Sequence, residues 1–85
     1  MEEILKQVIH GRVHLQIGKS GITKGALQQL ELQFKKKNFV KLRFLSLEHF
    51  ANMKDAANKI AKQSNAKIVD LRGKTVVLQG PKRKQ

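Results

Sequence analysis

The chain has 85 residues, 40% of them hydrophobic, and carries 18 Lys and Arg against 6 Asp and Glu, a net charge of +12. This length has room for one small core and excludes a second domain, and the absence of cysteine excludes disulfide and thiol chemistry. The positive charge runs from Lys6 to Lys84, which indicates a polyanionic partner and not merely a basic tail.

The N-terminal segment predicts a helix followed by a strand. In MEEILKQVIH the apolar residues share one helical face and Gly11 ends the pattern, which predicts a short helix over residues 2–10. The same stretch is charged within its first three residues and has no long apolar run. We therefore expect no signal peptide, no membrane span and a cytoplasmic protein. RVHLQI alternates between apolar and polar residues and predicts a half-buried strand over 12–17.

Two further helices and a second strand follow. Thr23 is a plausible N-cap for an amphipathic helix that runs to about Lys37. FVKLRFL alternates and predicts a strand over 39–45. For the third helix, either Ser46 or Asn52 is a suitable N-cap, and Asn65 is a suitable left-handed residue to end it.

The C-terminal part predicts a hairpin and a tail. KIVDL and TVVLQ flank the turn that contains Gly73, which is typical of two antiparallel strands over 67–71 and 75–79. Residues 82–85 read as a flexible basic tail, and residues 1–81 as one domain.

The element order is thus α-β-α-β-α-β-β, which predicts an α+β two-layer sandwich: a mixed four-stranded sheet with helices on one face. Strands joined through helices should be parallel, and the final hairpin adds an antiparallel strand. The other sheet face would then be a basic surface exposed to solvent, formed by Arg12, His14, Gln16, Lys41 and Arg43.

The stretch QIGKSGITKG, residues 16–25, suggests a phosphate site. A nucleotide-binding P-loop is excluded because it needs a glycine where this chain has Val13. The short Gly18-Lys19-Ser20-Gly21 loop remains either a simple strand-to-helix turn or a clamp for a phosphodiester backbone. For the clamp, Lys19, Ser20 and the N–H groups around both glycines would be donors, with Lys24 in the first helical turn beside them.

Three segments together resemble the CRM domain (chloroplast RNA splicing and ribosome maturation): IGKSGITKGAL with its basic helix, VKLRFL, and AKIVDLRGKTVVLQGP. The resemblance extends from Ile4 to Pro81 and is closest to the stand-alone, YhbY-like members. It implies RNA binding and a fold similar to the C-terminal domain of a bacterial translation initiation factor, with three helices. In that family the loop is compared with the backbone-clamping loop of KH domains, and stand-alone members are linked to precursors of the large ribosomal subunit. Many relatives have a tyrosine and then a basic residue where this chain has Gln79 and Gly80.

Other residue types indicate ordinary packing. Phe34, Phe44 and Phe50 have the phase of core residues and Phe39 is expected to be partly open, so contacts to phosphate, sugar and RNA shape should dominate over base stacking. His10 and His14 are expected to face solvent and not to bind zinc. Glu48 and His49 lack the partners that a catalytic pair requires.

The sequence therefore predicts a monomeric, non-enzymatic RNA-binding protein without cofactor or metal. The residues expected to contact RNA are Gly18, Lys19, Ser20, Gly21, Lys24, Arg12, Lys41, Arg43 and, if they lie on the same side as Lys19, Lys35, Lys36 and Lys37. Two alternatives remain open: an Alba-like protein that coats DNA or RNA, and a protein-interaction module of an assembly particle.

Overall fold

The computed structural model describes residues 11–81. The helix expected over 2–10 and the tail over 82–85 lie outside the described residues. The elements are β1 (Leu15–Ile17), α2 (Lys24–Lys36), β2 (Phe39–Phe44), α3 (Met53–Ser64), β3 (Lys67–Arg72) and β4 (Thr75–Gln79).

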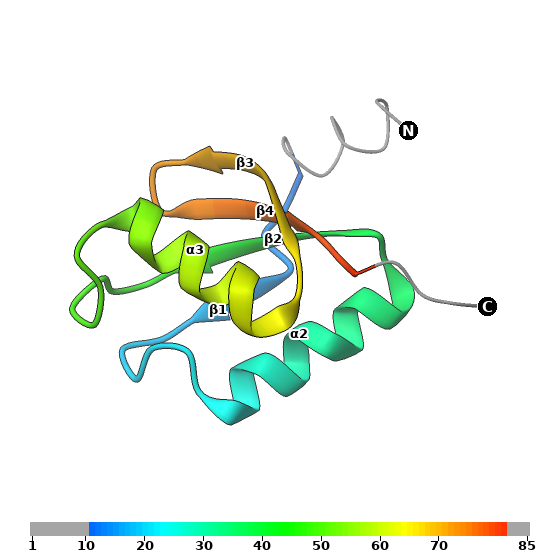
Figure 1. The fold of residues 1–85 in the computed structure, drawn as a ribbon, viewed down its shortest axis with the longest axis horizontal. Helices are drawn as coiled ribbons and strands as arrows, with labels where there is room; N and C mark the ends of the chain where they lie inside the picture. Colours follow the sequence, from blue (N-terminus) through cyan, green and yellow to red (C-terminus); the bar gives the residue numbers. More distant parts are fainter. Residues whose placement is uncertain (1–10, 82–85) are drawn as a thin grey trace.

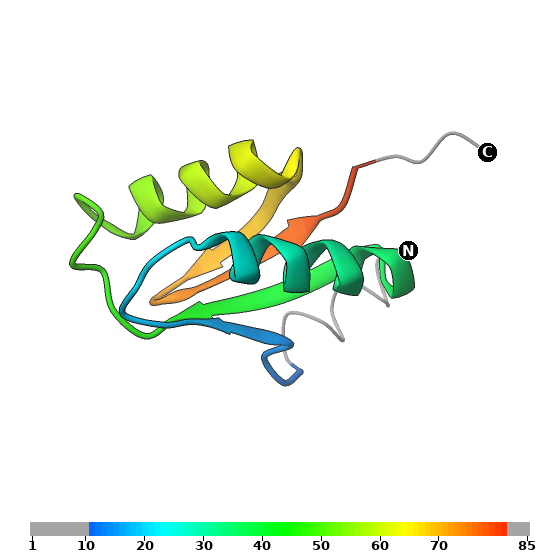
Figure 2. The ribbon, with the colours of Figure 1, turned by 90° about the horizontal axis from the view of Figure 1, so that it is seen from below.

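The strands form one mixed sheet in the order β1-β2-β4-β3. β1 pairs with β2 in parallel, whereas β4 is antiparallel to both of its neighbours, β2 and β3. α3 connects β2 to β3, and the final hairpin places β4 between these two strands (Figure 1). Seen along the sheet, α2 and α3 lie on the same face (Figure 2). This arrangement confirms the α+β two-layer fold expected from the sequence.

Side-chain caps explain where the two helices begin. Thr23 accepts a hydrogen bond from the N–H of Ala26 at 3.1 Å and caps α2. Asn52 accepts one from the N–H of Asp55 at 2.8 Å, which makes it the N-cap of α3. Ser46, the other candidate, instead accepts from the N–H of Glu48 at 3.3 Å and stabilises a turn in the preceding loop.

The core lies between the sheet and the two helices. β2 points Val40, Leu42 and Phe44 into it, as the alternation predicts, and each is fully buried. The facing residues include Leu30 of α2 and Ile60 of α3. The Phe50 ring packs edge-on against Phe44 at 5.4 Å between centroids, which fixes the loop before α3 on the core.

Phe39 and Val77 correct the expectation for the other sheet face. Phe39 was expected to be partly open, but it is only 7% exposed, and Val77 on the same face is 1% exposed. Alternation assigns a residue to a face but does not say whether that face is covered. This face is therefore not the continuous solvent-exposed basic surface that the sequence suggested.

His14 was expected to face solvent, but it is partly buried and its ring is hydrogen-bonded. Its backbone N–H donates to the carbonyl of Lys41 at 2.9 Å, and its ring Nδ1 accepts the N–H of Lys41 at 3.0 Å. The imidazole thus takes the place of a backbone carbonyl in the pairing with β2. This explains why β1 begins at Leu15 and not at Arg12.

Protonation of His14 should destabilise the fold. Burial, and then the charges of Lys37 and Lys41, lower the pKa of His14 below its usual value. The unfolded chain therefore takes up this proton at a higher pH than the folded chain does. The stability that depends on neutral His14 is complete above about pH 6.5, the ordinary imidazole value, and is lost as the pH falls below it.

We expect acidification from about pH 7.5 to about pH 5 to lower the melting temperature of the wild type by a few degrees more than that of His14→Asn. The asparagine side-chain oxygen can accept the Lys41 N–H at either pH, so this variant keeps the acceptor without the titration. Thermal unfolding followed by circular dichroism measures both proteins. The same pH dependence in the two would contradict the role assigned to His14.

Candidate nucleic-acid interface

Three segments that are distant in the sequence meet at one end of the sheet. Leu45 donates its N–H to the carbonyl of Ile17 at 2.8 Å, and Phe44 donates to the carbonyl of Lys74 at 2.9 Å. These bonds bring together the Gly18–Gly21 turn, the loop over 45–52 and the hairpin turn over 72–74, on the left of Figure 1. We call these three segments, with the start of α2, the loop end of the molecule.

The Gly18–Gly21 segment is a tight turn whose two glycines differ. The N–H of Gly21 donates to the carbonyl of Gly18 at 3.0 Å and closes the turn. Gly21 is buried and has φ +77°, a backbone conformation that favours glycine. Gly18 has no atom within 4 Å of the place where a Cβ would stand. Lys19 and Ser20, between them, are exposed.

The turn leaves backbone donors at its apex. We expected N–H groups around both glycines to face a phosphate, but the N–H of Gly21 is used within the turn. Within the described part of the chain, no group accepts a hydrogen bond from the N–H of Lys19 or of Ser20. The N–H of the exposed Gly18 likewise has no acceptor there, so the donors available to an anion are those of Gly18, Lys19 and Ser20.

The first turn of α2 adds further donors next to the apex. Its first helical bond runs from the N–H of Leu27 to the carbonyl of Thr23 at 3.0 Å. The N–H groups of Lys24 and Gly25 have no acceptor among residues 11–81, and both residues are exposed. No acidic residue lies in this turn, so the partial positive charge of the helix start is open to an external anion.

The start of α3 lies at the same end but is occupied by the chain itself. Besides its Asn52 cap, Asp55 lies in the first turn. Its carboxylate accepts the N–H of Ala51 at 3.1 Å and pairs with Lys59 at 3.3 Å. The bond from Ala51, followed by the one from Lys59, lowers the pKa of Asp55. Of the two helix starts, α2 is thus the one suited to an outside anion.

Several exposed cations lie at the loop end. Lys19 lies in the Gly18–Gly21 turn, Lys24 begins α2, Arg43 lies near the end of β2, and the hairpin turn adds Arg72 and Lys74. Arg72 is partly neutralised, because its Nε lies 3.3 Å from a carboxylate oxygen of Asp70. The two hairpin cations were not among the residues expected to contact RNA. The antiparallel position of β4 beside β2 is what brings them to the loop end.

The remaining predicted contacts lie elsewhere. Lys35 and Lys36 form the last turn of α2 and Lys37 is its C-cap. A helix rises about 1.5 Å per residue, so Lys36 lies about 18 Å along α2 from Lys24. Arg12 precedes β1 and is also far from the carboxyl end of that strand. These exposed cations form a second basic region at the opposite end of the molecule.

Lys41 is a weaker candidate than the sequence suggested. It is half-buried, and its ammonium donates to the carbonyl of Gly11 at 3.1 Å. Its N–H and carbonyl also bond to His14. Lys41 therefore fastens the chain that leads into β1, and the exposed Arg43 is the more accessible of the two predicted β2 cations.

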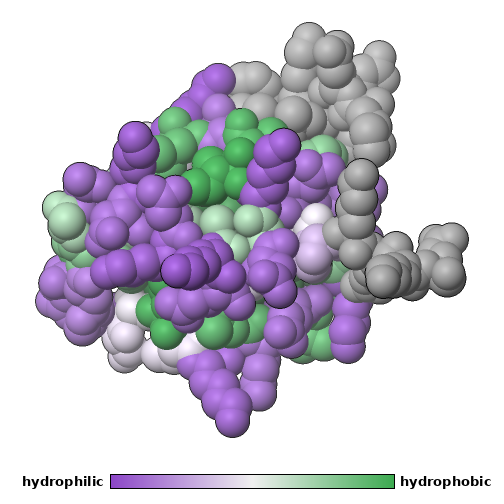
Figure 3. Space-filling view, in the orientation of Figure 1, coloured by the Kyte–Doolittle hydropathy of each residue, from purple (hydrophilic) through white to green (hydrophobic). Residues whose placement is uncertain are grey.

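Hydrophilic side chains cover most of the helix face of the molecule (Figure 3).

His49 contacts the turn, and sequence reasoning missed this contact. Its Nε2 lies 2.6 Å from the carbonyl oxygen of Lys19, although the two residues are 30 positions apart. The carboxylate of Glu48 lies 3.6 Å from the same nitrogen, and both side chains are more than half exposed. No local pattern around His49 predicts this contact, because it depends on the meeting of β1 and β2 at the loop end.

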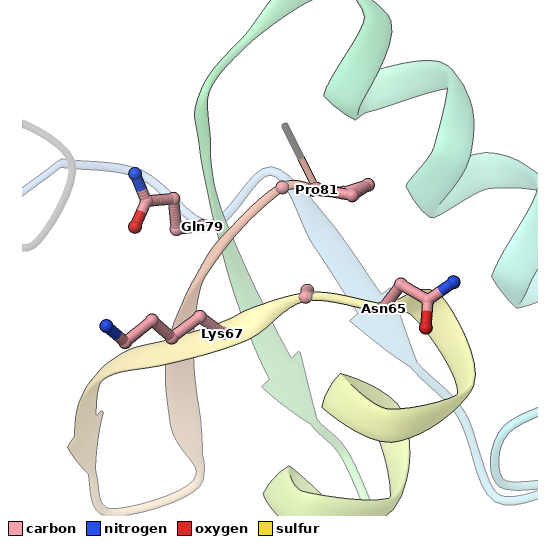
Figure 4. A pocket seen from close by; sticks show the side chains of 6 residues that line it. Asn65, Lys67, Gln79 and Pro81 are labelled. Atoms are coloured by element: carbon pink, nitrogen blue, oxygen red, sulfur yellow. The ribbon is translucent and has the colours of Figure 1, made fainter. Parts of the chain in front are cut away.

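A shallow pocket of about 280 Å³ lies at the opposite end of the sheet, lined by Asn65, Ala66, Lys67, Gln79, Gly80 and Pro81 (Figure 4). A Cβ on Gly80 would lie 2.7 Å from Cδ1 of Phe34, so the ring of Phe34 leaves no room for a side chain there. A basic residue at this position would require the Phe34 ring to move. The pocket shares no residue with the loop end.

Within the described residues, no group of three or more His, Cys, Asp and Glu residues lies close enough to hold a metal ion. Neither described helix has the length and apolar character needed to cross a membrane.

Comparison with known proteins identifies the family. The family model of the CRS1/YhbY (CRM) domain matches residues 1–78. A solution structure of a hypothetical protein from Staphylococcus aureus, whose description suggests that it binds RNA, is similar with a TM-score of 0.78 and 18% sequence identity. The match covers 98% of this chain and 85% of that one, and it supports the fold. No curated protein sequence matches the chain.

The CRM domain is an RNA-binding family and not an enzyme family. This chain, matched over almost its whole length, belongs to the CRS1/YhbY (CRM) domain family.

Proposed function

We propose that this protein binds the phosphate backbone of RNA at its loop end. The observation that carries the proposal is the Gly18–Gly21 turn, with its exposed apex, joined to the start of α2. There the backbone donors of Lys19, Ser20, Lys24 and Gly25 have no acceptor within residues 11–81. Backbone N–H groups at a helix start are suited to phosphate because they combine directed donors with a partial positive charge. The ammonium groups of Lys19 and Lys24 add charge next to these donors.

Recognition on this surface depends on backbone and shape more than on bases. The sequence has no Tyr or Trp, and Phe44 and Phe39 are buried. A row of stacked bases needs several exposed aromatic rings, and the loop end offers only the imidazole of His49, since Phe50 there packs on Phe44. The RNA is therefore held by contacts to phosphate and sugar.

We also propose that the cellular target is ribosomal RNA in a precursor of the large ribosomal subunit. The support is the resemblance to stand-alone CRM proteins, which are linked to such precursors. Equilibrium binding to large-subunit ribosomal RNA fragments and to duplex DNA of equal length, at several salt concentrations, tests this. With about five phosphates neutralised, log K should fall against log salt with a slope of about −3.5 for a single strand to −4.5 for a duplex.

Other outcomes would select other functions. Equal affinity for the DNA duplex would favour a coating protein of the Alba type. No binding to either nucleic acid, with retention of the protein on a preribosomal particle, would favour a protein-interaction module. A slope near zero would exclude the electrostatic mechanism.

Gly18→Asp is expected to weaken RNA binding by about tenfold, because like charges roughly 6 Å apart at an effective dielectric constant of about 40 repel by about 1.4 kcal/mol. Gly18→Ala is the matched control: it adds the Cβ into open space without the charge, so its affinity should stay close to that of the wild type. Gly18 is the better position for this test because a side chain at Gly21 would strain the turn and approach the His49 ring at 3.1 Å. If Gly18→Asp binds RNA as the wild type does, the turn is only a connection between β1 and α2.

Removal of the lysines at the two ends should have different effects on short and long RNA. Lys19→Ala/Lys24→Ala is expected to weaken binding of both a 4-nucleotide and a 20-nucleotide single strand. Lys35→Ala/Lys36→Ala/Lys37→Ala should leave the short RNA unaffected and reduce the salt slope for the long RNA by about 2, since each neutralised phosphate of a single strand contributes about 0.7. Equal effects of the two variants on the short RNA would contradict the assignment of the primary contact to the loop end.

A further inference from the structure

His49 lies against the Gly18–Gly21 turn from a loop that is distant in sequence. Its Nε2 lies 2.6 Å from the carbonyl oxygen of Lys19. A carbonyl oxygen can only accept a hydrogen bond, so Nε2 must carry the hydrogen. The ring also lies close to Gly21, where an added Cβ would be 3.1 Å from Cδ2.

The hydrogen bond acts on the central peptide of the turn. The bond from Gly21 to Gly18 makes the Lys19–Ser20 peptide the middle one. A trans peptide is planar, and its C=O and N–H point in opposite directions. When His49 holds the Lys19 carbonyl, the N–H of Ser20 must point away from His49. No group within residues 11–81 accepts that N–H.

The alternative orientation of this peptide would reverse the chemistry of the apex. A flip of the central peptide converts a type I turn into a type II turn, which requires a positive φ at Ser20. Ser20 does not have a positive φ, because Asn65 is the one non-glycine residue with positive φ among those described. The central peptide therefore has the type I orientation. After a flip, the Lys19 carbonyl would point where the Ser20 N–H now points, and an oxygen would face the phosphate in place of a donor.

We propose that His49 is a positioning residue that holds the Lys19–Ser20 peptide with the Ser20 N–H facing an RNA phosphate. This inference rests on the proposed function and adds the group that orients its central donor. The imidazole acts through the peptide and does not itself bind the phosphate.

The segment around His49 is anchored well enough for this role. The N–H of Phe50 donates to the carbonyl of Leu47 at 2.9 Å, and the Phe50 ring packs on Phe44. Asn52 caps α3 directly afterwards. The His49 side chain itself is 52% exposed, so its removal takes little from the core. A His49 variant should therefore fold and report on the turn.

The test compares His49→Ala and His49→Gln with the wild type, each as the full chain, in binding to a 12-nucleotide single-stranded RNA at about pH 8. His49→Ala should bind about three- to tenfold more weakly, the effect expected for partial loss of one donor to a charged group. His49→Gln, whose amide can donate to the Lys19 carbonyl, should recover most of the affinity.

The salt dependence separates this role from a charge contribution. His49→Ala should keep the salt slope of the wild type, whereas Lys19→Ala should reduce it by about 0.7. In the Gly18→Asp background, replacement of His49 should have little further effect, because it acts through the same turn. An NMR spectrum should show the Ser20 amide signal shifted by His49→Ala and restored by His49→Gln, with most other amide signals in place.

The results distinguish failure of this inference from failure of the proposed function. If the wild type and Gly18→Asp bind RNA equally, the proposed RNA site at the turn fails, whatever His49 does. If Gly18→Asp weakens binding but His49→Ala does not, the positioning role is rejected and the site is retained. An undiminished effect of His49→Ala in the Gly18→Asp background would mean direct contact of the imidazole with RNA, which also overturns the positioning role.

Discussion

The parallel pairing of β1 with β2 is the constraint on which the loop end depends. Because the two strands run in the same direction, the chain leaves both at the same end of the sheet, and the bond from Leu45 to Ile17 holds these exits together. The Gly18–Gly21 turn and the 45–52 loop therefore begin side by side. β4 enters the sheet antiparallel to β2, which adds the hairpin turn to the same end. One pairing thus determines which segments of the sequence become neighbours.

Local patterns in the sequence were sufficient to predict most of the fold. The alternation in β2 correctly assigned Val40, Leu42 and Phe44 to the core, and the hairpin was predicted with its β4 boundaries. The errors have a common origin. Alternation assigned Phe39 to the outer face without indicating that it would be buried there. It also treated His14 as one more outward polar residue, although its ring replaces a backbone acceptor at the sheet edge.

The candidate site was predictable where it is local in sequence. Gly18–Gly21 and Lys24 form one continuous motif, so the sequence was enough to single them out. The contact of His49 spans 30 positions and requires the strand pairing to be known. For Lys35–Lys37 the sequence left open which side they occupy, and the straight helix between them and Lys24 places them at the other end.

The two basic ends differ in what they can contribute to binding. Charges act over about 10 Å at 0.1 M salt, so the lysines of both ends attract RNA without fixing its position. A backbone N–H acts only at hydrogen-bond distance, about 2.7–3.2 Å, and in one direction. Unpartnered backbone donors next to lysines are found at the loop end, whereas at Lys35–Lys37 the helix presents its carbonyl end. On the proposed mode of binding, the loop end therefore fixes the register of the RNA backbone and the opposite end adds attraction alone. The orientation of a single peptide in the turn then matters more to recognition than any one of the many lysines.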